Sequence, residues 1–345
     1  MMQTAAPGAI NNKMNQQFNH VQSAHCESGV VSNLLRHNGL QISEPMAFGI
    51  GSGIFFGHLP FVKVNGIPGT TYRIWPSGIL NKVCKRLGVQ VHSEKFSNPQ
   101  KAMAALDQAV AANIPVGMQS SVYYLPYLPQ AYRFHFNAHN LVVFGKEGNE
   151  YLVSDPVMEG PAKIDPESLA QARFAKGYPE PKGRMYHVSH VPSQVDFRKP
   201  VKQGIEQTCN FMLKVPFPML GIKGIRYLSK KIVKYPELGE RKAALFLGNI
   251  IRMQEEIGTG GAGFRFMYAA FLQEAGIKLQ NDELRNLAQS LTAVGDEWRN
   301  FAFEAGRVCK ARTVDQNAFV NLSQLLMHVA EGEQQFFTKL SKVKL

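Results

Sequence analysis

Three residues of this chain have the types and the spacing that nucleophilic catalysis needs: Cys26, His139 and Asp155. Apolar residues after Cys26 recur at helical spacing, which predicts a buried helix with Cys26 at or near its N-terminus. Free N–H groups and the helix dipole at such an end favour a thiolate and can hold an oxyanion. Taken alone, a cysteine in this setting is more often a buried apolar side chain, so the other two residues decide the interpretation.

His139 and Asp155 stand at the two ends of a predicted β-hairpin. Two β-rich runs flank a turn at residues 147–149. The outer ends of an antiparallel hairpin lie side by side, so Asp155 can accept a hydrogen bond from the imidazole and fix its tautomer. The alternative is a histidine and an aspartate at strand ends on the surface. With Cys26 upstream, the order of the three residues in the chain and their places at a helix start and at paired strand ends favour Cys-His-Asp catalysis.

The elements that must position these residues are predicted to form an α+β domain followed by helices. The first part combines helices at 78–87 and 99–112 with strands at 72–75, 89–96, 114–121 and 185–191. The glycine-rich stretch 48–57 is predicted to be loop backbone packed under a core. After 197–200 only helices are expected, at 200–214, 219–233, 237–256, 263–275, 281–306 and 314–341. This predicts a loose arm at 1–17, an α+β domain at 18–196 and an all-α domain at 197–345.

The composition of the chain indicates its cellular compartment and the kind of partner it could bind. The four cysteines show no C-x-x-C spacing, which argues against a zinc site or a disulfide scaffold and fits a reducing cytoplasm. No metal is expected. The N-terminus lacks the apolar core of a signal peptide. The formal net charge of +12 implies an acidic partner. No nucleic-acid-binding motif is present, so an acidic protein is favoured over nucleic acid, while contact with an anionic membrane stays open.

Several short motifs resemble the butirosin biosynthesis protein H family, N-terminal domain, over roughly residues 18 to 190. They are His25-Cys26-Glu27, Leu34-Leu35-Arg36, Ser43-Glu44-Pro45-Met46, Phe48-Gly49-x-Gly51-x-Gly53, Tyr123-Tyr124, His135-Phe136 and His139 with its hairpin. The resemblance implies a papain-like cysteine-protease-type fold. It also implies transfer of an acyl group from an acyl carrier protein thioester to an amine. The implied nucleophile is Cys26, the base His139 and the orienting acid Asp155.

The resemblance leaves the oxyanion donor open. Papain-like enzymes carry a glutamine about six residues before the cysteine, where this chain has His20; Gln22 lies four residues before it. Either side chain could act with the Cys26 backbone N–H, and a structural role for His20 is an alternative. Two further residues within the motifs, Glu44 and Tyr124, are candidates for substrate binding.

The helical part resembles the C-terminal domain often fused to this family. Its most distinctive stretch is the glycine-rich 257–268, which could approach an anionic group or simply let helices pack closely. Arg265 and Tyr268 are its candidate substrate-binding side chains. A basic run could form a solvated helix face or a docking site for an acidic carrier protein. Its residues are Lys223, Arg226, Lys230, Lys231 and Lys234.

The sequence therefore favours a cysteine acyltransferase of natural-product or lipid biosynthesis, acting on an amine or hydroxyl acceptor. The expected partners are an acidic acyl carrier protein and a small-molecule amine. No tightly bound cofactor is expected, because phosphopantetheine would arrive on the carrier protein. A cysteine peptidase or amidase with the same triad is the alternative, and a binding protein in a papain-like shell is the third. The sequence does not indicate the oligomeric state.

Overall fold

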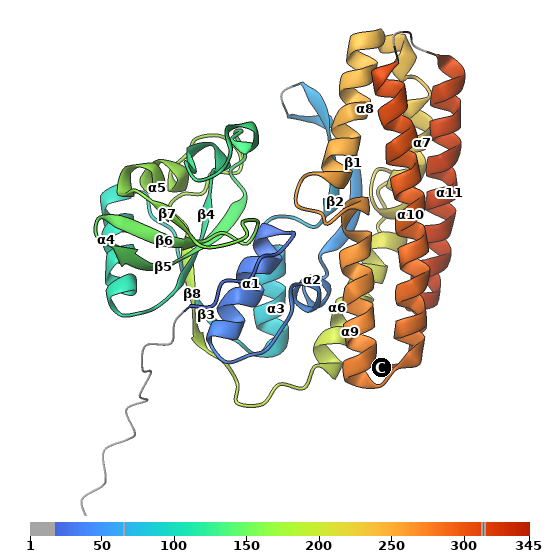
Figure 1. Cartoon of the computed structure of the whole chain (residues 1–345). Coiled ribbons are helices and arrows are strands. Elements are labelled where there is room, and N and C mark those ends of the chain that lie inside the picture. Colours follow the sequence, from blue (N-terminus) through green and yellow to red (C-terminus); the bar gives the residue numbers. More distant parts are fainter. Residues whose placement is uncertain (1–17, 65, 312, 314) are drawn as a thin grey trace, which may run out of the picture.

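The computed structural model describes residues 18–64, 66–311, 313 and 315–345. The arm expected at residues 1–17 lies outside the described residues. Figure 1 shows a sheet-containing part on the left, a group of short helices in the middle and a bundle of long helices on the right. The expectation of an α+β part followed by an all-α part is confirmed.

A six-stranded antiparallel sheet carries the hairpin of interest, in the order β3-β8-β4-β5-β6-β7. In chain order its strands are β3 (Gln90–Glu94), β4 (Val116–Ser120), β5 (His139–Glu147), β6 (Glu150–Ser154), β7 (Ala162–Ile164) and β8 (Met185–His190). Side chains alternate between its faces. Val143 packs with α4 (Pro99–Ala111) and α5 (Pro166–Arg173), whereas Val142 packs on the side of α1 (Cys26–His37). The sheet is therefore covered on both faces.

The remaining elements surround α1 and complete the helical part. Next to α1 lie α2 (Glu44–Ile50) and α3 (Gly78–Leu87), and a hairpin of β1 (Ile54–Val64) and β2 (Ile67–Arg73) extends among the long helices (Figure 1). These helices are α6 (Arg198–Leu213), α7 (Gly221–Ile232), α8 (Glu240–Glu255), α9 (Arg265–Leu279), α10 (Asp282–Lys310) and α11 (Gln316–Leu340). All six lie within a few residues of the predicted ranges. Five of them have a clear apolar stripe, whereas the apolar residues of α9 lie on all its sides. In the described part of the chain, no helix combines the length and the apolarity that crossing a bilayer requires.

The stretch predicted as loop, 48–57, is not loop throughout. Its first residues end α2 and its last begin β1, and β2 is longer than the short strand expected at 72–75. The glycines do allow close packing, as expected. A Cβ at Gly49 would lie 2.0 Å from the ring of Phe271, so the backbone of α2 contacts α9 directly. Glycines weakened the apparent periodicity of this stretch, although they are what allows these elements to pack.

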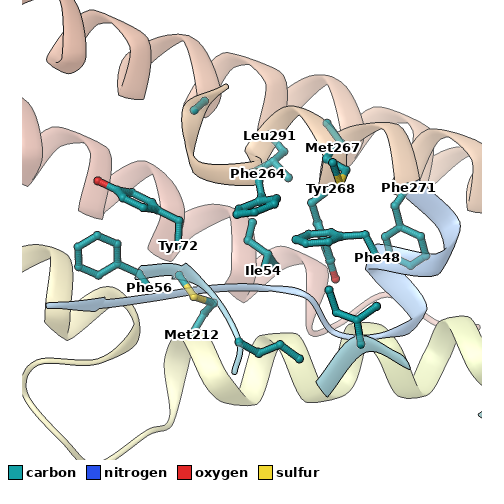
Figure 2. Packing of buried hydrophobic residues seen from close by; sticks show 14 of the residues in the cluster. Phe48, Ile54, Phe56, Tyr72, Met212, Phe264, Met267, Tyr268, Phe271 and Leu291 are labelled. Carbon is teal, nitrogen blue, oxygen red and sulfur yellow. The ribbon is translucent and has the colours of Figure 1, made fainter. Parts of the chain in front are cut away.

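One hydrophobic core joins the N-terminal helices to the helical part. Figure 2 shows Phe48 of α2, Phe56 of β1 and Tyr72 of β2 packed against Phe264 and other residues from the C-terminal helices. Phe48 and Phe264 stack with ring centroids 4.9 Å apart. The boundary expected between 196 and 197 marks the change from sheet to helix, but the apolar core runs across it.

Candidate active site

Cys26 begins the buried helix α1, with only 7% of its surface exposed. Glu44, at the start of α2, fixes the turn that leads into this helix: its carboxylate accepts the backbone N–H groups of Ala24 at 3.0 Å and His25 at 2.7 Å. The N–H groups of a first helical turn have no acceptor within the helix. The backbone N–H of Cys26 is therefore in a position where an oxyanion could be held.

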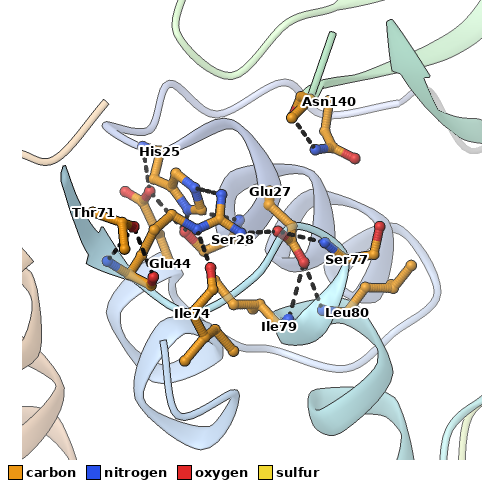
Figure 3. Close-up of polar contacts among 12 residues, drawn as sticks. His25, Glu27, Ser28, Glu44, Thr71, Ile74, Ser77, Ile79, Leu80 and Asn140 are labelled. Carbon is orange, nitrogen blue, oxygen red and sulfur yellow. Dashed lines mark hydrogen bonds and ion pairs between the residues drawn. The ribbon is translucent and has the colours of Figure 1, made fainter. Parts of the chain in front are cut away.

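The two neighbours of Cys26 anchor the helix. The Arg73 guanidinium donates to His25 Nε2 at 2.7 Å and also to Glu27. The buried Glu27 carboxylate accepts the backbone N–H groups of Ile79 at 2.9 Å and Leu80 at 3.2 Å, at the start of α3 (Figure 3). Charge-assisted bonds of this kind are strong and directional. The residues flanking Cys26 therefore hold α1, β2 and α3 together and fix the thiol in place.

His25 is adjacent to the thiol in sequence but is not placed to act as its base. Arg73 can only donate, so His25 Nε2 accepts its hydrogen bond, while Nδ1 accepts the backbone N–H of Ser28 at 3.3 Å and caps α1. Nδ1 lies 2.9 Å from Ser28 Oγ. Burial, followed by the nearby charge of Arg73, lowers the pKa of His25 well below its usual value. The ring is neutral and both nitrogens are engaged.

His139 and Asp155 meet as the hairpin geometry predicts. His139 begins β5, Asp155 follows β6, and His139 Nε2 lies 2.7 Å from Asp155 Oδ2. This leaves Nδ1 as the nitrogen available to the Cys26 thiol, which lies close enough to raise the pKa of His139. Burial lowers the pKa of His139, but the Asp155 carboxylate and Cys26 outweigh it and raise that pKa above its usual range. The structure thus brings together the three residues selected from the sequence, in an arrangement that favours the protonated form of His139.

Tyr127 is a fourth member of this cluster, and the sequence analysis did not select it. Its hydroxyl donates to Asp155 Oδ2 at 2.9 Å, the same oxygen that His139 contacts. Burial and the neighbouring carboxylate raise the pKa of Tyr127 well above its usual value, so it remains a donor. The only signal in the sequence was the tyrosine-rich turn at 123–127. Nothing in that turn shows which tyrosine faces the carboxylate.

We expect Tyr127→Phe to slow alkylation of Cys26 at neutral pH by about tenfold or less, because Asp155 loses one of the three hydrogen bonds that orient it. The loss of a donor also leaves more negative charge facing His139, so the pKa of His139 should rise further. The measurement is the rate of Cys26 alkylation as a function of pH, in which the alkaline limit should move upward. Tyr132→Phe, at an exposed tyrosine, is the matched control. Identical pH profiles for Tyr127→Phe and the wild type would show that the bond is irrelevant to reactivity.

Of the two expected oxyanion donors, His20 is held by other contacts, and Gln22 stays a prediction. His20 Nε2 donates to the carbonyl of Met158 at 3.0 Å, and Nδ1 lies 2.7 Å from Ser154 Oγ. His20 therefore ties the segment before α1 to the loop that carries Asp155, and its N–H is not directed toward the thiol. Gln22 is exposed. Of the candidates, the backbone N–H of Cys26 is the one whose position follows from the helix.

The side chains expected to bind substrate are also placed differently. Arg265 and Tyr268 are fully buried in the helical part, where Arg265 Nε donates to Glu333 Oε1 at 2.6 Å. Substrate binding by these two residues is not consistent with their burial, because neither reaches a surface. Glu44 positions the backbone before Cys26, as described above. Tyr124 is half-buried beside Tyr123, in a short helix that precedes the segment leading to His139.

The expected basic run lies on and just after α7. The apolar side of this helix is buried, whereas Lys223, Lys230, Lys231 and Lys234 are exposed. Arg226 is half-buried and its guanidinium donates to Gln334. This is the arrangement of a solvated basic face. Docking of a carrier protein on it remains a prediction.

The other three cysteines have no such setting. Burial raises the pKa of the Cys84 and Cys209 thiols to about 12, so both remain protonated at neutral pH. Cys309 is half-buried and unpaired, and burial raises its pKa as well. Over the described ranges, no group of three or more His, Cys, Asp or Glu side chains is arranged to hold a metal ion. Of the four cysteines, Cys26 is the one that pairs with a histidine-carboxylate couple.

A cysteine at a helix N-terminus, facing a histidine and an aspartate at the end of an antiparallel sheet, defines a papain-like cysteine enzyme. The family model described as a domain of unknown function (DUF4872) matches residues 167–340, and the chain belongs to this family. The model of butirosin biosynthesis protein H, N-terminal, matches residues 25–156, which confirms the resemblance expected from the motifs.

Comparison with individual proteins gives weaker similarities than the two family models. None of the curated proteins matches this chain. Among solved structures, one described as a C39-like peptidase from Bacillus anthracis is similar with a TM-score of 0.37 and 14% sequence identity, over 51% of this chain and 96% of that one.

Proposed function

We propose that the protein is a cysteine-dependent acyltransferase. It moves an acyl group from an acyl carrier protein thioester, through an acyl-Cys26 intermediate, to an amine or hydroxyl acceptor. The observation that carries this proposal is the Cys26, His139 and Asp155 cluster in a chain whose N-terminal part matches butirosin biosynthesis protein H. Such a reaction would be a step of natural-product or lipid biosynthesis.

The geometry supports a two-step mechanism. In the first step the Cys26 thiolate attacks the thioester carbonyl, and the helix N-terminus stabilises the oxyanion. The carrier-protein thiol leaves and takes the proton from His139. In the second step the acceptor amine attacks the acyl-enzyme and gives its proton to His139, and the Cys26 thiolate leaves. Exchange between two sulfurs is close to energetically neutral, whereas amide formation is downhill, so a thiol nucleophile suits this donor.

The partners belong to the same proposal. A carrier protein presents acidic helices, and the net charge of +12 together with the exposed basic face of α7 offers complementary charge. Phosphopantetheine would be delivered as part of the donor, so no bound cofactor is required. A reaction with this donor would take place in the cytoplasm.

The test is intact-protein mass spectrometry of the wild type and Cys26→Ala with a panel of acyl carrier protein thioesters. We expect a mass increase equal to the acyl group, present only with Cys26 and lost when a suitable amine is added. If no donor forms an adduct but an amide-based thiol probe labels Cys26, the protein is a peptidase or amidase. If neither reagent labels Cys26, it is a binding protein.

A further inference from the structure

One segment of the helical part touches both sides of the Cys26 and His139 pair. It consists of the end of α8 and the glycine-rich stretch that follows, residues 252–264, which we call the bridging segment. The family model of unknown function, 167–340, includes this segment. Its contacts therefore bear on what that domain contributes to the site.

The first set of contacts is with the residues just before Cys26. A Cβ at Gly258 would lie 3.3 Å from the carbonyl oxygen of Ala24, and a Cβ at Gly260 would lie 3.5 Å from the Ala24 Cβ. Phe264 packs edge-to-face on the His25 ring, with centroids 5.2 Å apart. The bridging segment thus lies directly against the entry to the catalytic helix.

The second contact is on the histidine side. The Arg252 guanidinium lies over the ring of Phe134, 4.9 Å from its centroid. Phe134 belongs to the segment that leads into β5, five residues before His139. The same short stretch of the helical part therefore contacts both segments that lead to the catalytic pair, the one before Cys26 and the one before His139.

The base of the bridging segment is held firmly, whereas its tip is open. Thr259 Oγ1 donates to the Gln254 carbonyl at 2.7 Å, and the Glu255 carboxylate accepts the Ala262 N–H at 3.1 Å. Gly260 is exposed, and Gly258 is half-buried. Within the described part of the chain, the backbone N–H of the exposed Gly260 makes no hydrogen bond, whereas Thr259 between the two glycines is buried. A fixed loop with an open backbone donor, next to the residues that precede Cys26, is suited to pairing with an amide.

We propose that the tip at Gly258–Gly260 forms one wall of the entrance to Cys26 and binds the amide groups of an extended pantetheine arm. The inference rests on the proposed function and deepens it, because it assigns the helical domain a direct part in donor binding. Glycine suits this position, since its backbone is open to a passing chain and φ at Gly260 is +67°. The pantetheine arm carries two amides and must cross this rim to bring its thioester to the thiol.

The test uses Gly260→Trp, which fills the proposed wall, and Gly239→Trp as the matched control. Gly239 is also exposed, has a positive φ of +84° and has no atom within 4 Å of a Cβ, so a large side chain there meets no neighbour. Each protein is alkylated at Cys26 with bromoacetyl-pantetheine and, separately, with bromoacetamide. These reagents need a reactive thiol but no acyl transfer, so the result does not depend on turnover.

We expect Gly260→Trp to slow bromoacetyl-pantetheine by tenfold or more and to leave bromoacetamide within about twofold. Gly239→Trp is expected to match the wild type with both reagents. Equal slowing of both reagents, or no slowing of either, would overturn the proposal. If Gly260→Trp does not fold, Gly260→Asn replaces it, because asparagine tolerates a positive φ. Failure of the wild type to accept any thioester would instead count against the proposed function.

Discussion

Replacing Cys26 with alanine is expected to abolish the acyl adduct and to reduce turnover by roughly 10⁴-fold or more. The proposal places the acyl group on this thiol, and of the four cysteines Cys26 is the one that lies close enough to His139 to act on its pKa. Cys26→Ser should be nearly as inactive, because a serine hydroxyl is far less acidic than a thiol. The measurement is the rate of product formation together with the intact mass after exposure to donor.

Cys309→Ala is the matched control for this experiment. Cys309 is half-buried and lies on α10, away from His139, so its loss should leave the adduct unchanged. The far-ultraviolet circular dichroism and the melting temperature of Cys26→Ala should match those of the wild type. Retention of an acyl adduct by Cys26→Ala would show that the nucleophile is another residue.

Replacing His139 with alanine is expected to slow the reaction by about 10³-fold. The imidazole stabilises the thiolate, protonates the leaving thiol and accepts the proton of the amine, so both steps depend on it. The clearest measurement is alkylation of Cys26 by iodoacetamide at neutral pH, which reports the thiolate without any acyl donor. His135→Ala is the control, since this exposed neighbour stacks on Tyr123 and does not contact Asp155.

The pH dependence of stability gives a second readout for His139. Although burial lowers its pKa, Asp155 and Cys26 raise the pKa above that of the unfolded chain. The contribution of His139 to the free energy of unfolding is therefore fully present below about pH 6.5 and is lost as the pH rises through the raised value. Urea unfolding at neutral and alkaline pH should show this loss in the wild type and not in His139→Ala. Equal loss in both proteins would mean that another group is responsible.

The sequence was sufficient to predict that Cys26, His139 and Asp155 come together, for local reasons. Helical spacing after Cys26 predicted its place at a helix start, and the strand-turn-strand pattern predicted that His139 and Asp155 lie side by side. Helix ends and hairpins depend on residues close together in the chain, so their geometry is encoded locally. The six C-terminal helices were predicted for the same reason.

Contacts between distant segments required the tertiary structure. Tyr127 reaches Asp155 across 28 positions, and Arg73 joins His25 and Glu27 from 48 and 46 positions away. His20, Arg265 and Tyr268 looked available in the sequence, but each is held by contacts or burial from remote segments. Residue type and spacing do not show which face of a loop or helix becomes buried.

Packing also decided how the sheet-containing part and the helical part of the chain contact each other. The sequence predicted a change of element type near residue 197, which the structure shows between β8 and α6. It did not predict that the bridging segment would lie against Ala24 and Phe134. Burial of apolar surface is non-directional and acts between any segments that can meet, so a single core formed across the predicted boundary. Local pattern thus determined that Cys26 begins a helix and that His139 and Asp155 lie side by side, whereas long-range packing decided which residues surround them.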